Sequence, residues 1–477
     1  MGSPDPFPTA RSQTSLRSRA APRSTSRARA AGRRRRTDSA FHQSRPSLRS
    51  VRAWSSRDWR LGRRAGRGCG AANGGPATAR MADSQLFCVA EERSGHCAVV
   101  DGNFLYVWGG YVSIEDNEVY LPNDEIWTYD IDSGLWRMHL MEGELPASMS
   151  GSCGACINGK LYIFGGYDDK GYSNRLYFVN LRTRDGTYIW EKITNFEGQP
   201  PTPRDKLSCW VYKDRLIYFG GYGCRRHSEL QDCFDVHDAS WEEQIFWGWH
   251  NDVHIFDTKT QTWFQPEIKG GVPPQPRAAH TCAVLGNKGY IFGGRVLQTR
   301  MNDLHYLNLD NWTWSGRITI NGESPKHRSW HTLTPIADDK LFLCGGLSAD
   351  NIPLSKLIEC FTLFIIFNHR LWHTACLGKE NEIMVFGGSK DDLLALDTGH
   401  CNDLLIFQTQ PYSLLRSCLD CIGKNSIMLE SQISLLPPKL LQQVLKKITF
   451  WAAANHREEQ RVQKEETENK YQWISSN

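Results

Sequence analysis

Leu105-Tyr-Val-Trp-Gly109-Gly110 is the first of six apolar runs in this 477-residue chain that end in a double glycine. Aromatic and β-branched residues recur in these runs, so each run predicts a buried β-strand. The paired glycines permit a turn where a Cβ atom would clash. The other five runs are Leu161-Tyr-Ile-Phe-Gly165-Gly166, Leu216-Ile-Tyr-Phe-Gly220-Gly221, Tyr290-Ile-Phe-Gly293-Gly294, Leu341-Phe-Leu-Cys-Gly345-Gly346 and Ile383-Met-Val-Phe-Gly387-Gly388.

A second marker stands 16 or 17 residues before each double glycine and has the form Arg-x-x-His in four of the six units. Because it recurs from unit to unit, we expect these arginines and histidines to form a hydrogen-bonded scaffold between units rather than to bind a ligand. The six markers are Arg93-Ser-Gly-His96, Met149-Ser-Gly-Ser152, Arg204-Asp-Lys-Leu207, Arg277-Ala-Ala-His280, Arg328-Ser-Trp-His331 and Arg370-Leu-Trp-His373.

A third marker, a short strand led by asparagine, follows the glycines in five units, and tryptophans near the unit ends fit an outer strand. Four short strands per unit, repeated six times, predict an all-β fold and a six-bladed β-propeller over residues 84–409. The three markers in register resemble the kelch family, which implies a kelch β-propeller. The asparagines are Asn123, Asn174, Asn251, Asn302 and Asn402, and the tryptophans are Trp136, Trp190, Trp263 and Trp314.

The spacing of the units is uneven, with intervals of 56, 55, 73, 52 and 42 residues between double glycines. The long third interval predicts an insertion from Gly223 to His250, and long loops on a rigid scaffold often bind ligands. The short fifth interval leaves room for one strand where two are expected. Residues 356–369 lack the Asn-Asp start and are apolar and β-prone, so we expect a shortened and less stable fifth blade.

The first 80 residues contain 19 arginines, no lysine and three acidic residues, a local charge of +16 within an overall charge of +4. Such a segment could be a nucleic-acid or membrane arm or a transit peptide, but low apolar content favours a disordered leader. We expect the globular part to begin near Met81. No run of 18 apolar residues occurs, so no membrane-spanning helix is predicted, and neither a membrane nor a nucleic acid is an expected partner.

The 15 cysteines show no disulfide framework, which indicates reduced thiols in a cytoplasmic or nuclear protein. Two Cys-x-x-Cys pairs, Cys153/Cys156 and Cys418/Cys421, could suggest zinc. Neither has a second ligand pair at zinc spacing, and the first lies in a predicted strand, so no metal or other cofactor is expected.

After the last predicted strand, Leu414, Cys418 and Ile422 recur at helical spacing behind Ser413, a suitable N-cap. The pattern resembles the elongin-binding box of substrate receptors for cullin–RING ubiquitin ligases. Downstream, Leu436, Pro437 and Leu440 resemble the short box that binds the elongin-linked cullin, and Pro437 with Pro438 is well placed to open a helix. We expect a helical region over 411–450 and a charged tail over 451–477. The alternative is an amphipathic helix that folds back on the propeller.

Taken together, these features resemble the kelch-repeat substrate receptors of elongin-linked cullin–RING ubiquitin ligases. The resemblance implies elongin B/C, a cullin and a RING protein as partners, and substrates that end in glycine. It also implies a set of binding residues. Arg295, Arg300 and Ser329 would hold the terminal carboxylate, Lys206 would hold a peptide carbonyl, and Tyr111, Tyr222, Trp249 and Trp330 would form the walls.

The local chemistry agrees with this assignment, because planar guanidinium groups suit a carboxylate. Arg295 and Arg300 could instead pair with acids such as Asp303, and Tyr111 and Tyr222 could be ordinary blade core. No catalytic set of a propeller enzyme is apparent, so we expect no enzymatic activity. A kelch scaffold or cytoskeletal binding protein without ligase association is the alternative function.

Overall fold

The computed structural model describes residues 89–114, 117–225, 246–337, 339–354, 358–359, 369–390, 399–452 and 454–455. The chain divides into two units, residues 1–49 and 50–477, and all described residues belong to the second. The predicted leader, most of the insertion in the third repeat and nearly all of the charged tail lie outside the described residues.

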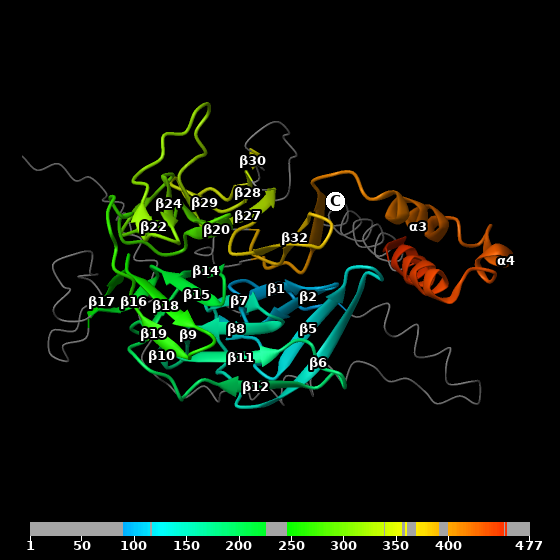
Figure 1. Cartoon of the computed structure of the whole chain (residues 1–477), viewed down its shortest axis with the longest axis horizontal. Coiled ribbons are helices and arrows are strands. Elements are labelled where there is room, and N and C mark those ends of the chain that lie inside the picture. Colours follow the sequence, from blue (N-terminus) through cyan, green and yellow to red (C-terminus); the bar gives the residue numbers. More distant parts are fainter. Residues whose placement is uncertain are drawn as a thin grey trace, which may run out of the picture. The chain divides into compact units, whose positions relative to one another are not determined.

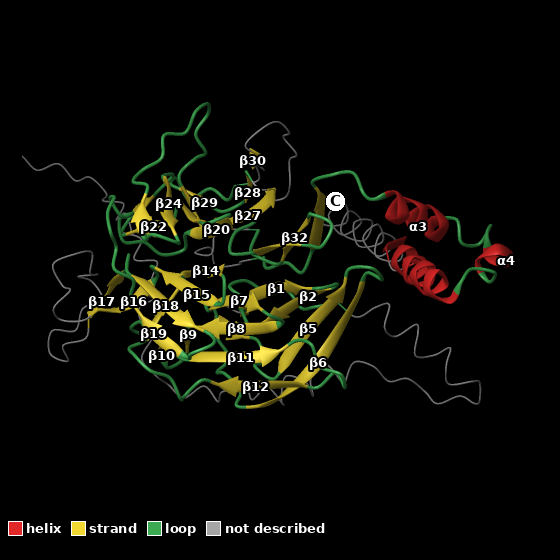
Figure 2. Cartoon of the chain, in the orientation of Figure 1, coloured by secondary structure: helices red, strands yellow, loops and turns green. Residues whose placement is uncertain are grey.

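Each of the first four repeats contributes four antiparallel strands, and the outermost strands of the first two repeats pair in parallel, which joins these two blades into one eight-stranded sheet (Figures 1 and 2). The blades are β1 (Cys97–Asp101), β2 (Phe104–Trp108), β5 (Glu125–Asp130) and β6 (Leu135–Gly143); β7 (Cys153–Ile157), β8 (Lys160–Phe164), β11 (Leu176–Asn180) and β12 (Tyr188–Lys192); β14 (Ser208–Tyr212), β15 (Arg215–Phe219), β18 (Val253–Asp257) and β19 (Thr262–Phe264); and β20 (Thr281–Leu285), β21 (Lys288–Phe292), β24 (Leu304–Asn308) and β25 (Thr313–Trp314). The fourth strands carry the predicted tryptophans, which are at most 3% exposed. These are Trp136, Trp190, Trp263 and Trp314.

The last two repeats form sheets with three described strands each. The fifth consists of β27 (Thr332–Ala337), β28 (Lys340–Cys344) and β30 (Ile358–Glu359), and the sixth of β31 (Thr374–Leu377), β32 (Glu382–Phe386) and β33 (Leu404–Gln408). β30 has two described residues, and most of the segment 356–369, on which the prediction of a shortened fifth blade rests, lies outside the described residues.

The six blades close into a ring. The first strands lie side by side in order, β1 against β7, then β14, β20, β27, β31 and β1 again. Where the last blade meets the first, the Gly388 N–H donates to the Arg93 carbonyl at 2.8 Å, and His96 Nε2 lies 2.8 Å from Thr374 Oγ1. The fold is therefore the six-bladed β-propeller that the repeat count predicts.

The marker arginines and histidines form the predicted scaffold. In five blades the arginine Nη1 donates to the carbonyl of the first glycine of the same blade, as from Arg277 to Gly293 at 2.8 Å. The histidines reach the preceding blade instead, as from His280 Nε2 to Ser208 Oγ at 2.8 Å. Burial and the nearby arginine lower the pKa of His280 to about 3, so this side chain stays neutral at physiological pH.

Short strands that follow the double glycines, and two that belong to the markers, pair at one end of the blades. They are β3 (Tyr111–Ile114) with β4 (Asn117–Tyr120); β9 (Tyr167–Asp168) with β10 (Gly171–Tyr172); β13 (Arg204–Asp205) with β16 (Tyr222–Arg225) and β17 (Phe246–Trp249); β22 (Arg295–Val296) with β23 (Thr299–Arg300); and β26 (Arg328–Ser329) with β29 (Leu347–Ser348). The glycines are needed here: a Cβ on Gly294, which has a φ of 99°, would lie 2.7 Å from the Cβ of His280.

Cys153 and Cys156 lie in β7, as predicted. A hydrogen bond with Cys209 and burial raise the pKa of the Cys153 thiol. All eleven described cysteines are free.

Helices follow the propeller: α3 (Leu414–Lys424), α4 (Glu430–Ile433) and a helix over 438–452 (Figure 2). Ser413 caps α3, because its Oγ accepts from the Arg416 N–H at 3.3 Å. The last helix begins directly after Pro437, as predicted, and it passes the expected boundary at 450. None of the described helices is long and apolar enough to cross a membrane.

Candidate functional site

The third residue of each marker belongs to a closed circle of backbone hydrogen bonds. Each of these N–H groups donates to the carbonyl of the corresponding residue in a neighbouring blade, at distances of 2.8–3.1 Å. All six residues have φ between 51° and 67°. Four of them are not glycine, and such residues rarely adopt this conformation unless the fold imposes it. The circle consists of Gly95, Gly151, Lys206, Ala279, Trp330 and Trp372.

These six residues line a cavity of about 100 Å³ together with the residue that follows each of them. The lining is asymmetric, because three of the six are small and three carry large side chains. Trp330 and Trp372 pack with ring centroids 5.8 Å apart, and Lys206 Nζ lies 5.3 Å from the Trp372 ring. The large side chains thus form an aromatic and cationic wall on one side of the cavity.

Arg295 and Arg300 face each other across the β22–β23 hairpin, where they form a cross-strand pair. They are only 4% and 5% exposed. Arg300 Nε donates to Ser329 Oγ at 3.0 Å, its Nη1 donates to Asn351 Oδ1 at 2.6 Å, and its guanidinium lies 5.9 Å from the Trp330 ring centre. The structure therefore brings together all three predicted carboxylate-binding residues and one predicted wall.

Asp303 does not pair with Arg295 or Arg300, the alternative that the sequence left open. Its carboxylate accepts two hydrogen bonds from Arg277, both at 2.8 Å, and a third from His305. Despite partial burial, these interactions lower the pKa of Asp303. Its charge is thus engaged by the scaffold.

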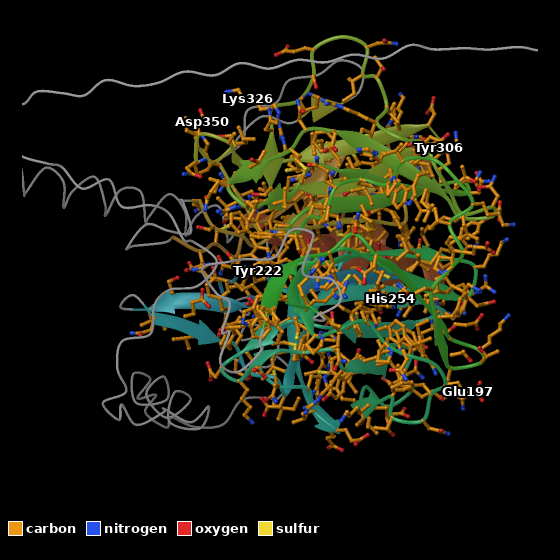
Figure 3. The ribbon with its side chains drawn as sticks, turned by 90° about the vertical axis from the view of Figure 1, so that its left-hand side faces the viewer. Glu197, Tyr222, His254, Tyr306, Lys326 and Asp350 are labelled. Carbon is orange, nitrogen blue, oxygen red and sulfur yellow. The ribbon has the colours of Figure 1, made fainter. Side chains whose placement is uncertain are left out.

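Two further predicted walls, Tyr222 and Trp249, form a cross-strand pair on β16 and β17 with ring centroids 4.9 Å apart. Tyr222 is 0% exposed and labelled in Figure 3. Tyr111 on β3 lies 5.5 Å from the Trp372 ring, and burial strongly raises the pKa of its hydroxyl. Lys206 forms an ion pair with the buried Asp205.

The residue after each double glycine pairs with the second residue of the marker in its own blade. This position is Tyr111 in the first blade, Tyr222 in the third and Arg295 in the fourth. The shared geometry places the predicted residues at the same end of their blades. It explains how side chains nearly 200 residues apart in sequence come to surround one axis.

Sequence reasoning missed Trp372 and Asn351. Trp372 could have been found, because it occupies the same marker position as Lys206 and Trp330. Asn351 gave no signal, since it reaches Arg300 from a turn after β29 and has a φ of 59°.

The predicted docking residues differ in exposure. Leu414 is 81% exposed and Cys418 is exposed, whereas Ile422 is partly buried in a helical core around Leu419, Ile433 and Val444. In the downstream box, Pro437 is exposed, whereas Leu436 and Leu440 pack partly against the same core.

Arg416 attaches α3 to the sixth blade. It is 8% exposed, and its Nη1 lies 3.0 Å from Glu380 Oε2 and 3.7 Å from Glu382 Oε1. Its guanidinium also lies 4.0 Å from the Tyr412 ring centre. This buried ion pair lies on the opposite face of the helix from exposed Leu414 and Cys418.

Comparison with known proteins gives a consistent assignment. Residues 95–346 match the KLHDC2/KLHL20/DRC7 Kelch-repeats domain. The chain is 94% identical to Kelch domain-containing protein 1 of Homo sapiens over 83% of this chain and 100% of that protein. It is 45% identical to Kelch domain-containing protein 2 of Homo sapiens over 78% of this chain and 94% of that protein. A solved structure titled "Structure of YjhT" covers 67% of the chain and 96% of its own length, with 14% identity and a TM-score of 0.49.

Proposed function

The chain belongs to the kelch-repeat family of Kelch domain-containing proteins 1 and 2, and from this premise we propose that it is the substrate-recognition subunit of a cullin–RING E3 ubiquitin ligase. In this role it binds the free carboxyl end of proteins that terminate in glycine. It bridges them to elongin B/C, an elongin-linked cullin and a RING protein, in the cytoplasm or nucleus. It supplies no catalytic group to ubiquitin transfer.

The observation that carries the proposal is the buried Arg295 and Arg300 pair beside Ser329. Two like charges held across one hairpin are favourable when an anion lies between or beside them. A carboxylate can accept bidentate hydrogen bonds from a guanidinium group and a further bond from the Ser329 hydroxyl. An amidated end lacks the charge and has one acceptor oxygen in place of the two of a carboxylate, so its interaction with the arginines is weaker.

The aromatic wall supports a preference for glycine. Trp330 and Trp372 leave a cavity of about 100 Å³ at the axis, and Lys206 closes one side of it. Trp330 Nε1 is buried and has no acceptor among the described residues, so it is available to a peptide carbonyl. A terminal residue without a Cβ fits best in so narrow a space.

The exposed stripe of α3 supports elongin binding. Leu414 and Cys418 project from a capped helix whose other face is anchored by Arg416 and Leu419. Exposed apolar side chains on an ordered helix are typical of a helix that docks into a groove. Pro437, exposed at the start of the last helix, is the part of the downstream box available to a cullin.

Peptide binding tests the first half of the proposal. A fluorescent peptide ending in Gly-Gly should bind the chain co-expressed with elongins B and C. Arg300→Ala should weaken binding about 100-fold or more, because it removes a desolvated charge partner. Ser329→Ala should cost about tenfold, the net value of one hydrogen bond to a charged group. Arg184→Ala, at an exposed site in the loop between β11 and β12, is the control; equal losses in all three variants would contradict the carboxylate site.

Co-purification tests the second half. Leu414→Ser combined with Cys418→Asp should abolish the elongin complex. Ser417→Ala, exposed on the same helix but turned away from the stripe, should retain it. A wild-type chain that folds yet recruits no elongin would favour the alternative, a scaffold or cytoskeletal binding protein with its helical core folded on itself.

A further inference from the structure

A second concave site lies beside the arginine hairpin. It is a groove of about 340 Å³ between the loop that precedes the Arg277 marker and the loop that follows β25. Its volume falls within the about 300–1,000 Å³ range of ligand sites. Val272, Pro273 and Met301 form its apolar part, and Arg300, Arg317 and His327 supply basic groups. The groove shares Arg300 with the carboxylate site described above, and its other lining residues lie outside that site.

Arg300 connects the groove to that site. The same residue lines the groove and binds Ser329 and Asn351 through its guanidinium. A bound peptide whose terminal carboxylate lies at Arg300 therefore extends away from the carboxylate site past this residue, where the groove begins. Each extended residue advances the chain by about 3.3 Å, so only a few residues separate the terminus from the groove.

The groove carries an uncompensated positive charge. The acid among its lining residues, Asp303, is bound to the fully buried Arg277. Lys326, next to His327, lies at the same edge as Asp350 (Figure 3). A hydrogen bond from Ser348 and the charges of Lys326 and Arg300 lower the pKa of Asp350. Arg317 is exposed and forms no ion pair with any residue that the structure describes. Its charge is thus left to a ligand.

We propose that this groove is an upstream subsite for the bound substrate, selecting acidic side chains three to six residues before the terminal glycine. The inference rests on the proposed function, because the groove receives the chain only when the terminus lies at Arg295 and Arg300. Exposed Arg317 supplies the selectivity, and the Val272–Pro273 loop and Met301 contact the backbone and apolar stems of the peptide.

Three fluorescent ten-residue peptides test the subsite. All end in Gly-Gly and carry glutamate, serine or lysine at positions three to six from the carboxyl end. The glutamate peptide should bind about two- to fivefold tighter than the serine peptide, and the lysine peptide weaker by a similar factor, as exposed charge pairs allow. The order should weaken as ionic strength rises.

Arg317→Glu should reverse this order while binding of the serine peptide stays within about twofold. Arg184→Glu makes the same charge change far from the groove in sequence and should leave the order unchanged. Equal affinities of all three peptides for the wild-type chain, or the same change in both variants, would overturn the subsite and leave the carboxylate site standing. If no Gly-Gly peptide binds a folded elongin complex, both the subsite and the proposed function fail.

Discussion

The fourth and fifth blades differ in how they hold the same arginine. In the fourth blade, Arg277 donates to the Gly293 carbonyl and forms two hydrogen bonds with Asp303. In the fifth, Arg328 donates to the Gly345 carbonyl at 3.0 Å and to the Lys326 carbonyl, but no carboxylate within the described ranges binds it. Both arginines are at most 1% exposed.

The difference shows which features the scaffold needs. The backbone bonds of the two arginines are alike, so the inner end of each blade is set by the marker and the double glycine. The equivalent of Asp303 is missing in the fifth repeat, because this repeat lacks the Asn-Asp pair that precedes the third strand in the fourth. Burial lowers the pKa of Arg328 to about 10, which shows a charge held at a cost. Ser329 and Trp330 lie on the intact inner end.

The largest effect should come from truncating the two arginines. Arg277→Ala leaves Asp303 partly buried without its cation and should lower the free energy of unfolding by about 3–5 kcal/mol. Arg328→Ala opens a similar cavity but leaves no stranded acid, so about 1–3 kcal/mol is expected. Urea unfolding of both variants measures the difference. Equal losses would mean that Arg328 has a charged partner after all.

Restoring the acid should stabilise the fifth blade. Lys356 lies outside the described residues. It stands two positions before Ile358 in the sequence, just as Asp303 stands two positions before His305. Ile358 and His305 are comparable, because they pair with equivalent residues of β28 and β21. Lys356→Asp restores an acid at the sequence position that Asp303 holds in the fourth repeat, and it should raise the free energy of unfolding by about 1.5–3 kcal/mol. Lys356→Ala is the control for removing the lysine alone. A thermal melt in which Lys356→Asp gains no more than Lys356→Ala would refute the missing-acid explanation.

Low pH should weaken the contacts between neighbouring blades equally at two places, those that His280 and His373 form. Burial, with the charge of the nearby marker arginine, lowers the pKa values of His280 and His373 to about 3 from an ordinary 6.5. Unfolded histidines bind protons below pH 6.5 and the folded ones do not, so the free energy of unfolding falls as the pH drops from 6.5 toward 3. The slope is about 1.4 kcal/mol per pH unit per histidine.

His280→Gln and His373→Gln should therefore flatten the pH dependence of stability by the same amount. His280 joins the third and fourth blades, and His373 bonds to Thr332 in the fifth. Chemical denaturation at pH 7 and pH 5 gives the slope. A markedly smaller change for His373→Gln would indicate that the seam beside the shortened blade is already open to water.

Much of this architecture could be predicted from the sequence, because a repeat that occurs six times sets its own pattern. The double glycines, the outer tryptophans, the scaffold arginines and the Ser413 cap all occupy their expected places. The acid partners of the scaffold arginines could not be predicted, since they depend on the register between the second and third strands.

The site was predictable only in part, for a similar reason. Arg295, Arg300 and Ser329 meet as the family resemblance implies, but the contribution of Trp372 depends on ring closure, which brings the sixth blade beside the first. Exposure on the helices was not predictable either. Ile422, Leu436 and Leu440 fit docking patterns, yet the packing of α3 against the last helix partly buries them.

Selective binding of a free carboxyl end is the most direct test of whether the pocket works beside the shortened fifth blade. Calorimetry should compare one Gly-Gly peptide with its carboxamide, titrated into residues 81–477 in complex with elongins B and C. We expect the free acid to bind at least about 100-fold more tightly than the amide, because only the acid brings a negative charge to Arg295 and Arg300. Equal affinity for the two peptides would contradict the carboxylate site.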